Sequence, residues 1–244
     1  MQPDLTGKRV LITGASRGVG AALAATVAQR GADLVLNYRN KRPRAEAVAQ
    51  QVRALGRHAL LVQADITVPE DTERMMQDAE AIGGLDVLVL NASGGLEKHQ
   101  ASDYALRLNR DAQIDLAERA LPLIPEGGRI VFVTSRLAHF YGEKPVFPGY
   151  ELVAQSKWAG EDALRARIPL FAERGVSLVV VSGDLIEGTI TPKLLQRSSP
   201  GLIEARREEA GGLPTTKAFA EAIADAAVDP KLKSGDTVYV GSVD

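Results

Sequence analysis

The sequence contains no cysteine, so the 244-residue chain can form no disulfides and carry out no thiol chemistry. Its net charge is only −2, which indicates no surface for nucleic acid or for a membrane. No apolar run approaches the length that a membrane-spanning helix needs. Residues 1–7 are short and polar, unlike a secretory signal. We therefore expect a cytoplasmic protein with no metal, no nucleic-acid partner and no membrane partner.

The rest of the composition is that of an ordinary globular protein, with 45% apolar and 25% charged residues. Strand-like and helix-like segments alternate without a linker, a low-complexity stretch or an internal repeat. This alternation favours βαβ units in a parallel sheet. We expect strands at 10–13, 34–37, 58–63, 85–90, 129–134, 176–181 and 237–240, and helices at 20–30, 44–55, 69–82, 103–121, 150–171, 191–209 and 215–228.

A glycine-rich turn follows the first strand. Val10, Leu11 and Ile12 end in Thr13, and three glycines precede an alanine-rich helix. Gly14 can adopt backbone angles that are closed to other residues. Gly18 and Gly20 have no side chain, so a phosphate and the next helix can approach the backbone closely. The N–H groups at the start of the helix would then face a ligand phosphate.

The spacing Thr13-Gly14-x-x-x-Gly18-x-Gly20 resembles the short-chain dehydrogenase/reductase family. The resemblance implies one domain over residues 1–244, with an α/β Rossmann fold in which helices cover both faces of a doubly wound, mostly parallel sheet. It implies an oxidoreductase with a nicotinamide cofactor at the carboxyl ends of the strands. On this basis the expected cofactor-binding residues are Thr13, Gly14, Ser16, Arg17, Gly18, Val19, Gly20, Arg39, Asp65, Ile66, Asn91, Ala92, Lys157, Gly183, Ile186 and Thr189.

Two arginines bear on the choice of cofactor. Arg39 follows the second strand, where a dinucleotide without a 2′-phosphate usually meets an acidic residue. Arg17 lies in the glycine-rich turn. Guanidinium groups suit a 2′-phosphate through bidentate hydrogen bonds. We therefore expect NADP(H), with NAD(H) as the alternative.

The catalytic pattern of the family is incomplete. Asn109, Ser135 and Lys157 match its asparagine, serine and lysine, but Val153 stands where the family has tyrosine. Four residues apart on a helix, that tyrosine would share a face with the lysine and protonate the alkoxide. Valine has no proton to give. The chain resembles atypical reductases of antibiotic pathways that also lack this tyrosine.

Three interpretations stay open. In the first, an NADPH-dependent ketoreductase acts on an aromatic polyketide, and the proton comes from a substrate phenol, from water or from a side chain such as Tyr150. In the second, Tyr150 and Lys157 are seven residues apart, as in related enoyl-thioester reductases, and the enzyme reduces a C=C bond. In the third, the chain is a non-catalytic NADP(H) sensor. The expected catalytic residues are Ser135, Lys157, Asn109 and Tyr150.

The segment 137–149 is rich in aromatic residues and borders the expected nicotinamide position. We expect it to bind a flat, apolar ketone through His139, Tyr141 and Phe147, together with Ser135. Residues 190–212 are expected to form a mobile lid. The family resemblance also implies a homodimer or homotetramer.

Overall fold

The protein folds around a parallel sheet. The structure is a computed structural model that describes residues 4–96 and 101–242. Within this part of the chain, seven strands lie in the order β3-β2-β1-β4-β5-β6-β7, and each pairs in parallel with its neighbours. They are β1 (Arg9–Ile12), β2 (Asp33–Tyr38), β3 (Ala59–Gln63), β4 (Val87–Leu90), β5 (Arg129–Ser135), β6 (Ser177–Gly183) and β7 (Thr237–Val240).

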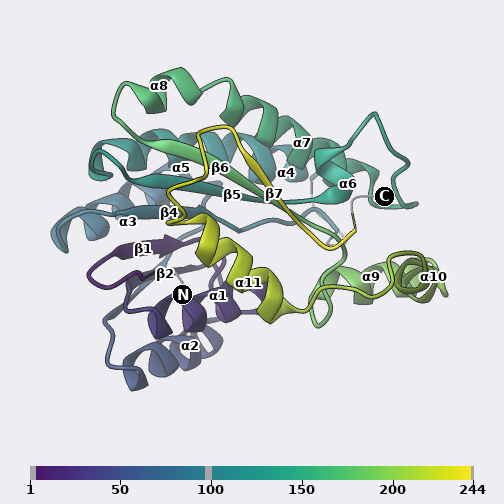
Figure 1. Ribbon diagram of the computed structural model, residues 1–244, viewed down its shortest axis with the longest axis horizontal. Coiled ribbons are helices and arrows are strands. Elements are labelled where there is room, and N and C mark those ends of the chain that lie inside the picture. Colours follow the sequence, from purple (N-terminus) through teal and green to yellow (C-terminus); the bar gives the residue numbers. More distant parts are fainter. Residues whose placement is uncertain (1–3, 97–100, 243–244) are drawn as a thin grey trace.

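Helices cover both faces of the sheet (Figure 1). One layer holds α1 (Gly18–Gln29), α2 (Arg42–Ala54) and α11 (Thr216–Ala226). The other holds α3 (Pro69–Ala81), α4 (Tyr104–Leu106), α5 (Ala112–Ala120), α7 (Glu151–Arg165) and α8 (Ile168–Ala172). The remaining helical elements are η1 (Arg107–Asp111), η2 (Leu121–Leu123), α6 (Arg136–His139), α9 (Ile190–Ser198) and α10 (Leu202–Glu209). The predicted α/β doubly wound fold is confirmed.

The sheet is buried on both faces, which explains its nearly continuous apolar strands. In β1, Leu11 faces the core layer of α3 and α5, whereas Val10 and Ile12 face the layer of α1 and α11. All four residues of β4 are buried, as the apolar run at 85–90 indicates. Strand alternation thus fills both cores, and the polar residues gather where the strands end.

Three helices expected to be continuous are divided. The helix expected at 103–121 contains a π-helical turn, η1, between α4 and α5. The helix expected at 150–171 ends with α7, and α8 begins with Pro169 in its first turn. The helix expected at 191–209 is divided at Gly201, whose φ of +85° no regular helix allows. Proline and glycine therefore divide the second and third of these helices, as their backbone chemistry demands.

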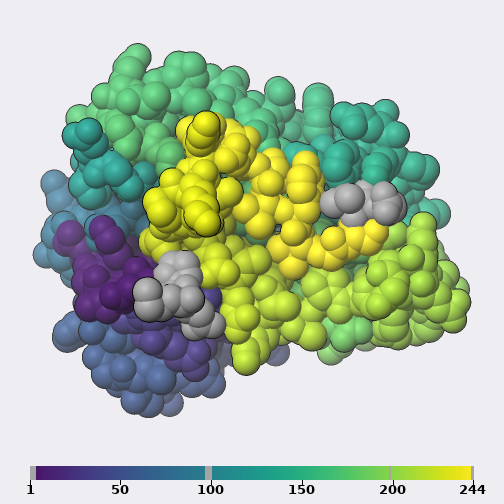
Figure 2. Space-filling view, in the orientation of Figure 1, coloured from purple at the N-terminus to yellow at the C-terminus, as the bar shows by residue number. Residues whose placement is uncertain are grey.

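The pair α9 and α10 projects from the sheet at the end of the molecule where α6 also lies (Figure 1). Figure 2 shows the same corner as a surface, with the yellow-green α9–α10 region below the teal segment that follows β5. Among residues 4–96 and 101–242, no helix is long and apolar enough to cross a bilayer. The same residues contain no group of three His, Asp or Glu side chains that could hold a metal ion.

Candidate active site

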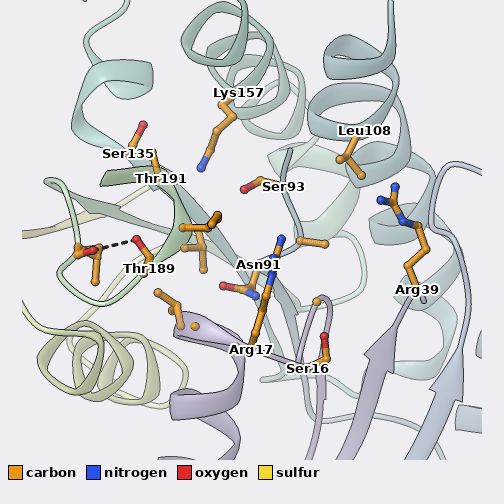
Figure 3. Close-up of a pocket in the computed structure, with 18 of the residues that line it drawn as sticks. Ser16, Arg17, Arg39, Asn91, Ser93, Leu108, Ser135, Lys157, Thr189 and Thr191 are labelled. Carbon is orange, nitrogen blue, oxygen red and sulfur yellow. Dashed lines mark hydrogen bonds between the residues drawn. The ribbon is translucent and has the colours of Figure 1, made fainter. Parts of the chain in front are cut away.

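A cavity of about 640 Å³ opens at the carboxyl ends of the strands. Its wall includes most of the predicted cofactor and catalytic residues: Gly14, Ser16, Arg17, Gly18, Val19, Gly20, Arg39, Asp65, Ile66, Asn91, Ala92, Ser135, Tyr150, Lys157, Ile186 and Thr189. Thr13, Asn109 and Gly183 do not line it. Figure 3 shows Lys157 and Ser135 at one end of this cavity and Arg39 at the other, with Arg17 and Asn91 between them.

The glycine-rich turn is held in shape by hydrogen bonds to β4 and the loop after it. The buried Thr13 Oγ1 accepts hydrogen bonds from the backbone N–H groups of Asn91 and Ala92, each at 2.9 Å. Asn91 Nδ2 donates to the Thr13 carbonyl oxygen at 2.8 Å. A Cβ atom on Gly20 would lie 2.5 Å from the Gly14 carbonyl oxygen. Thr13 is therefore a support for the turn, behind the cavity wall.

The same turn leaves room for a phosphate. Gly14 and Gly18 have φ values of +66° and +56°. A Cβ on Gly18 would meet only Thr189 Cγ2, at 4.0 Å, so the space above this backbone is open. Arg17 precedes the first residue of α1, and its exposed side chain extends beside Asn91 (Figure 3). A helix N-terminus, an open glycine backbone and a guanidinium are groups that can bind an anion.

At the far end of the cavity, Arg39 contacts Tyr104 and Asp65. Its Nη1 donates a hydrogen bond to the Tyr104 hydroxyl, and its guanidinium lies 3.9 Å from Asp65 Oδ2. The Arg39 guanidinium carbon also lies 5.9 Å from the centre of the Tyr104 ring. Lys41 and Arg44 line the same wall. This end of the cavity is therefore basic, with one carboxylate beside it.

Ser135 and Tyr150 meet at the opposite end. Ser135 is the last residue of β5, and its Oγ lies 3.3 Å from the Tyr150 hydroxyl. The same Oγ accepts a hydrogen bond from Ala138 N at 3.3 Å, which begins α6. Tyr150 immediately precedes α7 and is only 5% exposed. Val153 is also buried, but it packs with Leu137 and Tyr150 outside the cavity wall.

Burial shifts the pKa values of both titratable groups at this end. Burial raises the pKa of the Tyr150 phenol, and the hydrogen bond with Ser135 opposes that rise only in part. Burial lowers the pKa of Lys157 to about 8, although the charge of Glu161 opposes that change. The phenol is therefore neutral at physiological pH, and the lysine remains largely protonated. A neutral phenol can donate a hydrogen bond or a proton to a substrate oxygen.

Asn109 supports the site from behind the cavity. It lies in η1, is 1% exposed, and its Nδ2 donates to the Gly94 carbonyl and to Ser156 Oγ, each at 2.9 Å. A Cβ on Gly160 would lie 2.0 Å from the Asn109 carbonyl oxygen. The π-helical turn and α7 are therefore in very close contact at this point. That contact fixes the helix that carries Lys157.

The loop after β6 forms another wall of the cavity. Ile186 and Thr189 line the cavity, and Thr189 Oγ1 donates to the Ile186 carbonyl at 2.8 Å (Figure 3). A Cβ on Gly183 would lie 2.7 Å from Phe219 Cε2, so Gly183 serves close packing against α11. Asp184, which the sequence analysis did not single out, lines the cavity and binds Arg206 Nη2 at 2.7 Å. Both side chains of this pair are buried.

The three aromatic residues expected to bind substrate lie elsewhere in this structure. His139 Nδ1 lies 2.7 Å from Glu161 Oε1, and its Nε2 lies 2.9 Å from the Tyr239 hydroxyl. Tyr141 packs near Trp158, with ring centres 6.1 Å apart. Phe147 packs against the cluster around Tyr150. None of the three lines the cavity, because α6 turns the chain away from it immediately after Ser135.

Comparisons with known proteins agree with this geometry. Residues 8–197 match the short chain dehydrogenase family. Hydroxynaphthalene reductase arp2 of Aspergillus fumigatus is 31% identical over 206 residues, which are 81% of this chain and 73% of that protein. A short chain dehydrogenase from Burkholderia cenocepacia, solved in complex with NADP, has a TM-score of 0.84 and 30% identity over 98% of both chains. The angucycline C-6 ketoreductase LanV, solved with bound NADP, has a TM-score of 0.80 and 26% identity over 98% of this chain and 96% of its own. The chain belongs to the short-chain dehydrogenase family of oxidoreductases.

Proposed function

We propose that the protein reduces a ketone to a secondary alcohol with NADPH, and that Tyr150 takes the place of the family tyrosine. The observation that carries this proposal is the 3.3 Å contact between Ser135 Oγ and the Tyr150 hydroxyl. Both groups line one cavity with Lys157, below a glycine-rich turn suited to a diphosphate. The chain therefore holds a serine, a phenol and a lysine at one end of an anion-binding cavity.

The residues present fit a nicotinamide dinucleotide. Gly14, Gly18 and Gly20 leave their backbone free for a diphosphate, and Ile186 and Thr189 would flank the nicotinamide. Arg39 and Arg17 favour NADPH over NADH, because a guanidinium can bind the 2′-phosphate that NADH lacks. Relatives solved with NADP support the same cofactor. When bound, NADPH supplies the hydride for the carbonyl carbon.

Ser135 and Tyr150 would act on the carbonyl oxygen. Two hydroxyls 3.3 Å apart can both donate hydrogen bonds to one substrate oxygen. The Tyr150 phenol, whose pKa burial raises, stays protonated until that oxygen gains negative charge, and then gives it a proton. The Lys157 ammonium stabilises the phenolate that remains, which solvent later reprotonates.

The relatives support a class of substrate. They include a hydroxynaphthalene reductase and an angucycline C-6 ketoreductase, whose names both refer to aromatic compounds. We infer an aromatic polyketide ketone as substrate, in line with a finer resemblance to the angucyclinone ketoreductase of the simocyclinone pathway. A phenol beside the ketone would hydrogen-bond the same oxygen. It is the alternative proton source that the experiment must separate from Tyr150.

The test compares two ketones, one with a phenol next to the carbonyl and one with the matched methyl ether. Oxidation of NADPH is followed by its absorbance for wild type, Tyr150→Phe and Ser135→Ala. We expect Tyr150→Phe to slow reduction of the methyl ether by about 10²-fold or more, the usual contribution of one positioned acid. Equal rates of wild type and Tyr150→Phe on both ketones would show that the proton has another source. NADPH binding without reduction of either ketone would favour the sensor interpretation.

Enoyl-thioester reduction is the second candidate, because Tyr150 and Lys157 are seven residues apart. An enoyl thioester is therefore included as a third substrate. Its reduction in preference to both ketones, and loss of that activity in Tyr150→Phe, would replace ketone reduction as the function. Ser135→Ala separates the two candidates further. It should slow ketone reduction more than enoyl reduction, because only in the ketone mechanism do both hydroxyls contact the reacting oxygen.

A homodimer or homotetramer is part of the proposal. The outward face of α7 exposes Leu152 by 65% and Trp158 by 42%. Association through this face would remove both side chains from water. Light scattering of wild type and Leu152→Arg tests it: a smaller assembly in the variant supports this interface, and an unchanged mass excludes it.

A further inference from the structure

A buried carboxylate lies one helical turn beyond Lys157 on α7. Glu161 is 5% exposed and Lys157 is 8% exposed, so both lie on the buried face of the helix. Side chains four residues apart on a helix are neighbours, with Cβ atoms about 5–6 Å apart. A buried carboxylate is costly unless cations or donors surround it. The groups that contact Glu161 therefore bear on its role.

Two partners hold the same oxygen of Glu161. His139 Nδ1 lies 2.7 Å from Oε1, and Arg165 Nε donates to Oε1 at 2.9 Å. The other oxygen, Oε2, is buried and accepts no hydrogen bond from any residue in the described part of the chain. Hydrogen bonds to one oxygen thus fix the position of the carboxylate. The second oxygen has no hydrogen-bond donor in the described part of the chain, so the carboxylate can influence Lys157 only through its negative charge.

The partners are themselves anchored to β7. His139 Nε2 lies 2.9 Å from the Tyr239 hydroxyl. Arg165 donates to Thr237 Oγ1 at 2.7 Å and to the Gly235 carbonyl at 2.6 Å. Because α6, α7 and β7 all contribute, Glu161 cannot turn away from the helix face that it shares with Lys157. A surface ion pair would need only one of these contacts, whereas residues from three elements hold Glu161 and its partners.

We propose that Glu161 is a positioning residue of the active site: its carboxylate, oriented by His139 and Arg165, keeps the buried Lys157 in the charged ammonium form. The role of that charge rests on the proposed function, in which the ammonium stabilises the phenolate of Tyr150. His139, expected from the sequence to touch substrate, acts here through Glu161.

Burial and the charge of Glu161 shift the pKa of Lys157 in opposite directions. Burial alone lowers the pKa of Lys157, and the nearby negative charge of Glu161 raises it, with about 8 as the result. The titratable and charged groups around Glu161 are Lys157 and Arg165 on α7, His139 on α6 and, behind His139, Tyr239 on β7. Without Glu161, Lys157 would lose its proton at a lower pH.

The test titrates Lys157 directly in the enzyme without cofactor. Lysine is labelled with ¹³C at Cε, the Lys157 signal is assigned by its absence in Lys157→Met, and its shift is followed with pH by NMR. Glu161→Gln should lower the midpoint by about one pH unit, as loss of a close opposite charge does. Arg165→Met removes a positive charge beside Glu161 but leaves His139 to hold the same oxygen, so the carboxylate keeps its place and the midpoint should rise. Glu161→Asp should stay nearer to wild type than Glu161→Gln.

The opposite signs make the test decisive, since a general loosening of α7 would move both midpoints in the same direction. An unchanged midpoint in Glu161→Gln, or the same shift in Glu161→Gln and Arg165→Met, would overturn the proposal. The NMR titration needs no turnover, so its outcome is independent of whether ketone reduction is observed. Where turnover is measured, the alkaline limb of the pH–rate profile should move with the NMR midpoint.

Discussion

Replacing Lys157 by methionine should stabilise the protein at pH 7 while it impairs the proposed reaction. The ammonium is buried, and its pKa falls from 10.5 to about 8 because the charged form is poorly solvated there. Methionine has a similar length and carries no charge, so it fills the same space without this penalty. The change in the free energy of unfolding caused by Lys157→Met therefore measures the cost of burying the Lys157 ammonium.

The magnitude follows from the two pKa values. The difference between 10.5 and about 8 corresponds to about 3 kcal/mol at 1.36 kcal/mol per pH unit. Between pH 8 and 10.5 the unfolded chain binds more protons at this lysine than the folded chain, so wild-type stability rises with pH across that window. The advantage of Lys157→Met should thus be about 3 kcal/mol below pH 8 and vanish above pH 10.5.

Urea unfolding at pH 7 and at pH 10.5 checks both the size and the sign, and the comparison with wild type cancels other titrating groups. Lys193→Met is the matched control, because Lys193 lines the same cavity but is exposed, and its replacement should change stability by less than about 0.5 kcal/mol. Equal stability of wild type and Lys157→Met at pH 7, or an advantage that persists above pH 10.5, would refute the reasoning.

Four further predictions concern the same cavity. Gly20→Ala places a methyl group 2.5 Å from the Gly14 carbonyl, so the turn must shift and NADPH affinity, measured by calorimetry, should fall at least about 10-fold. Arg39→Ala should raise the KM for NADPH about 10-fold or more and leave the KM for NADH nearly unchanged, and equal effects on both would disprove 2′-phosphate recognition. Asp184→Asn removes the buried carboxylate partner of Arg206 and leaves it only the exposed Glu209, so it should destabilise the fold by about 2 kcal/mol in urea. Oxidation of the alcohol product should keep accelerating above pH 9, because burial raises the pKa of Tyr150 from 10.0, and a plateau below pH 9 would contradict this.

The parts of the fold that local chemistry controls were predictable from the sequence. The apolar runs at β1 and β4 and the glycines after β1 determine the backbone conformation of only the few residues around them. The structure has strands and a turn at these positions, as expected. Two of the divided helices also had local signals, because Pro169 and Gly201 cannot continue a regular helix. The π-helical turn in η1 had none, since its close contact with Gly160 is made by a distant segment.

The residues of the cavity wall were predictable where a single strand or helix supplies them. Ser135 and Lys157 line the cavity as expected, since each follows from its own element. The partners of His139 were not predictable, because Glu161 is 22 residues away and Tyr239 is 100 residues away. Arg206 was missed for the same reason: its carboxylate partner lies 22 residues earlier, across a loop, and no local pattern marks a buried ion pair.

The position of Tyr150 bears on how it would transfer a proton in the proposed reaction. A tyrosine four residues before Lys157 would sit about 6 Å away along the helix axis, whereas one seven residues before it sits about 10 Å away on nearly the same face. The charge of Lys157 consequently acts less on this phenol, and the shift of its pKa is governed by burial and by Ser135. A neutral phenol can donate a proton to an oxygen that becomes an alkoxide, and it can accept one only after it has become a phenolate at high pH. Tyr150 is thus protonated at neutral pH, as the proposed reduction requires, and Lys157 would contribute mainly after the proton has left Tyr150.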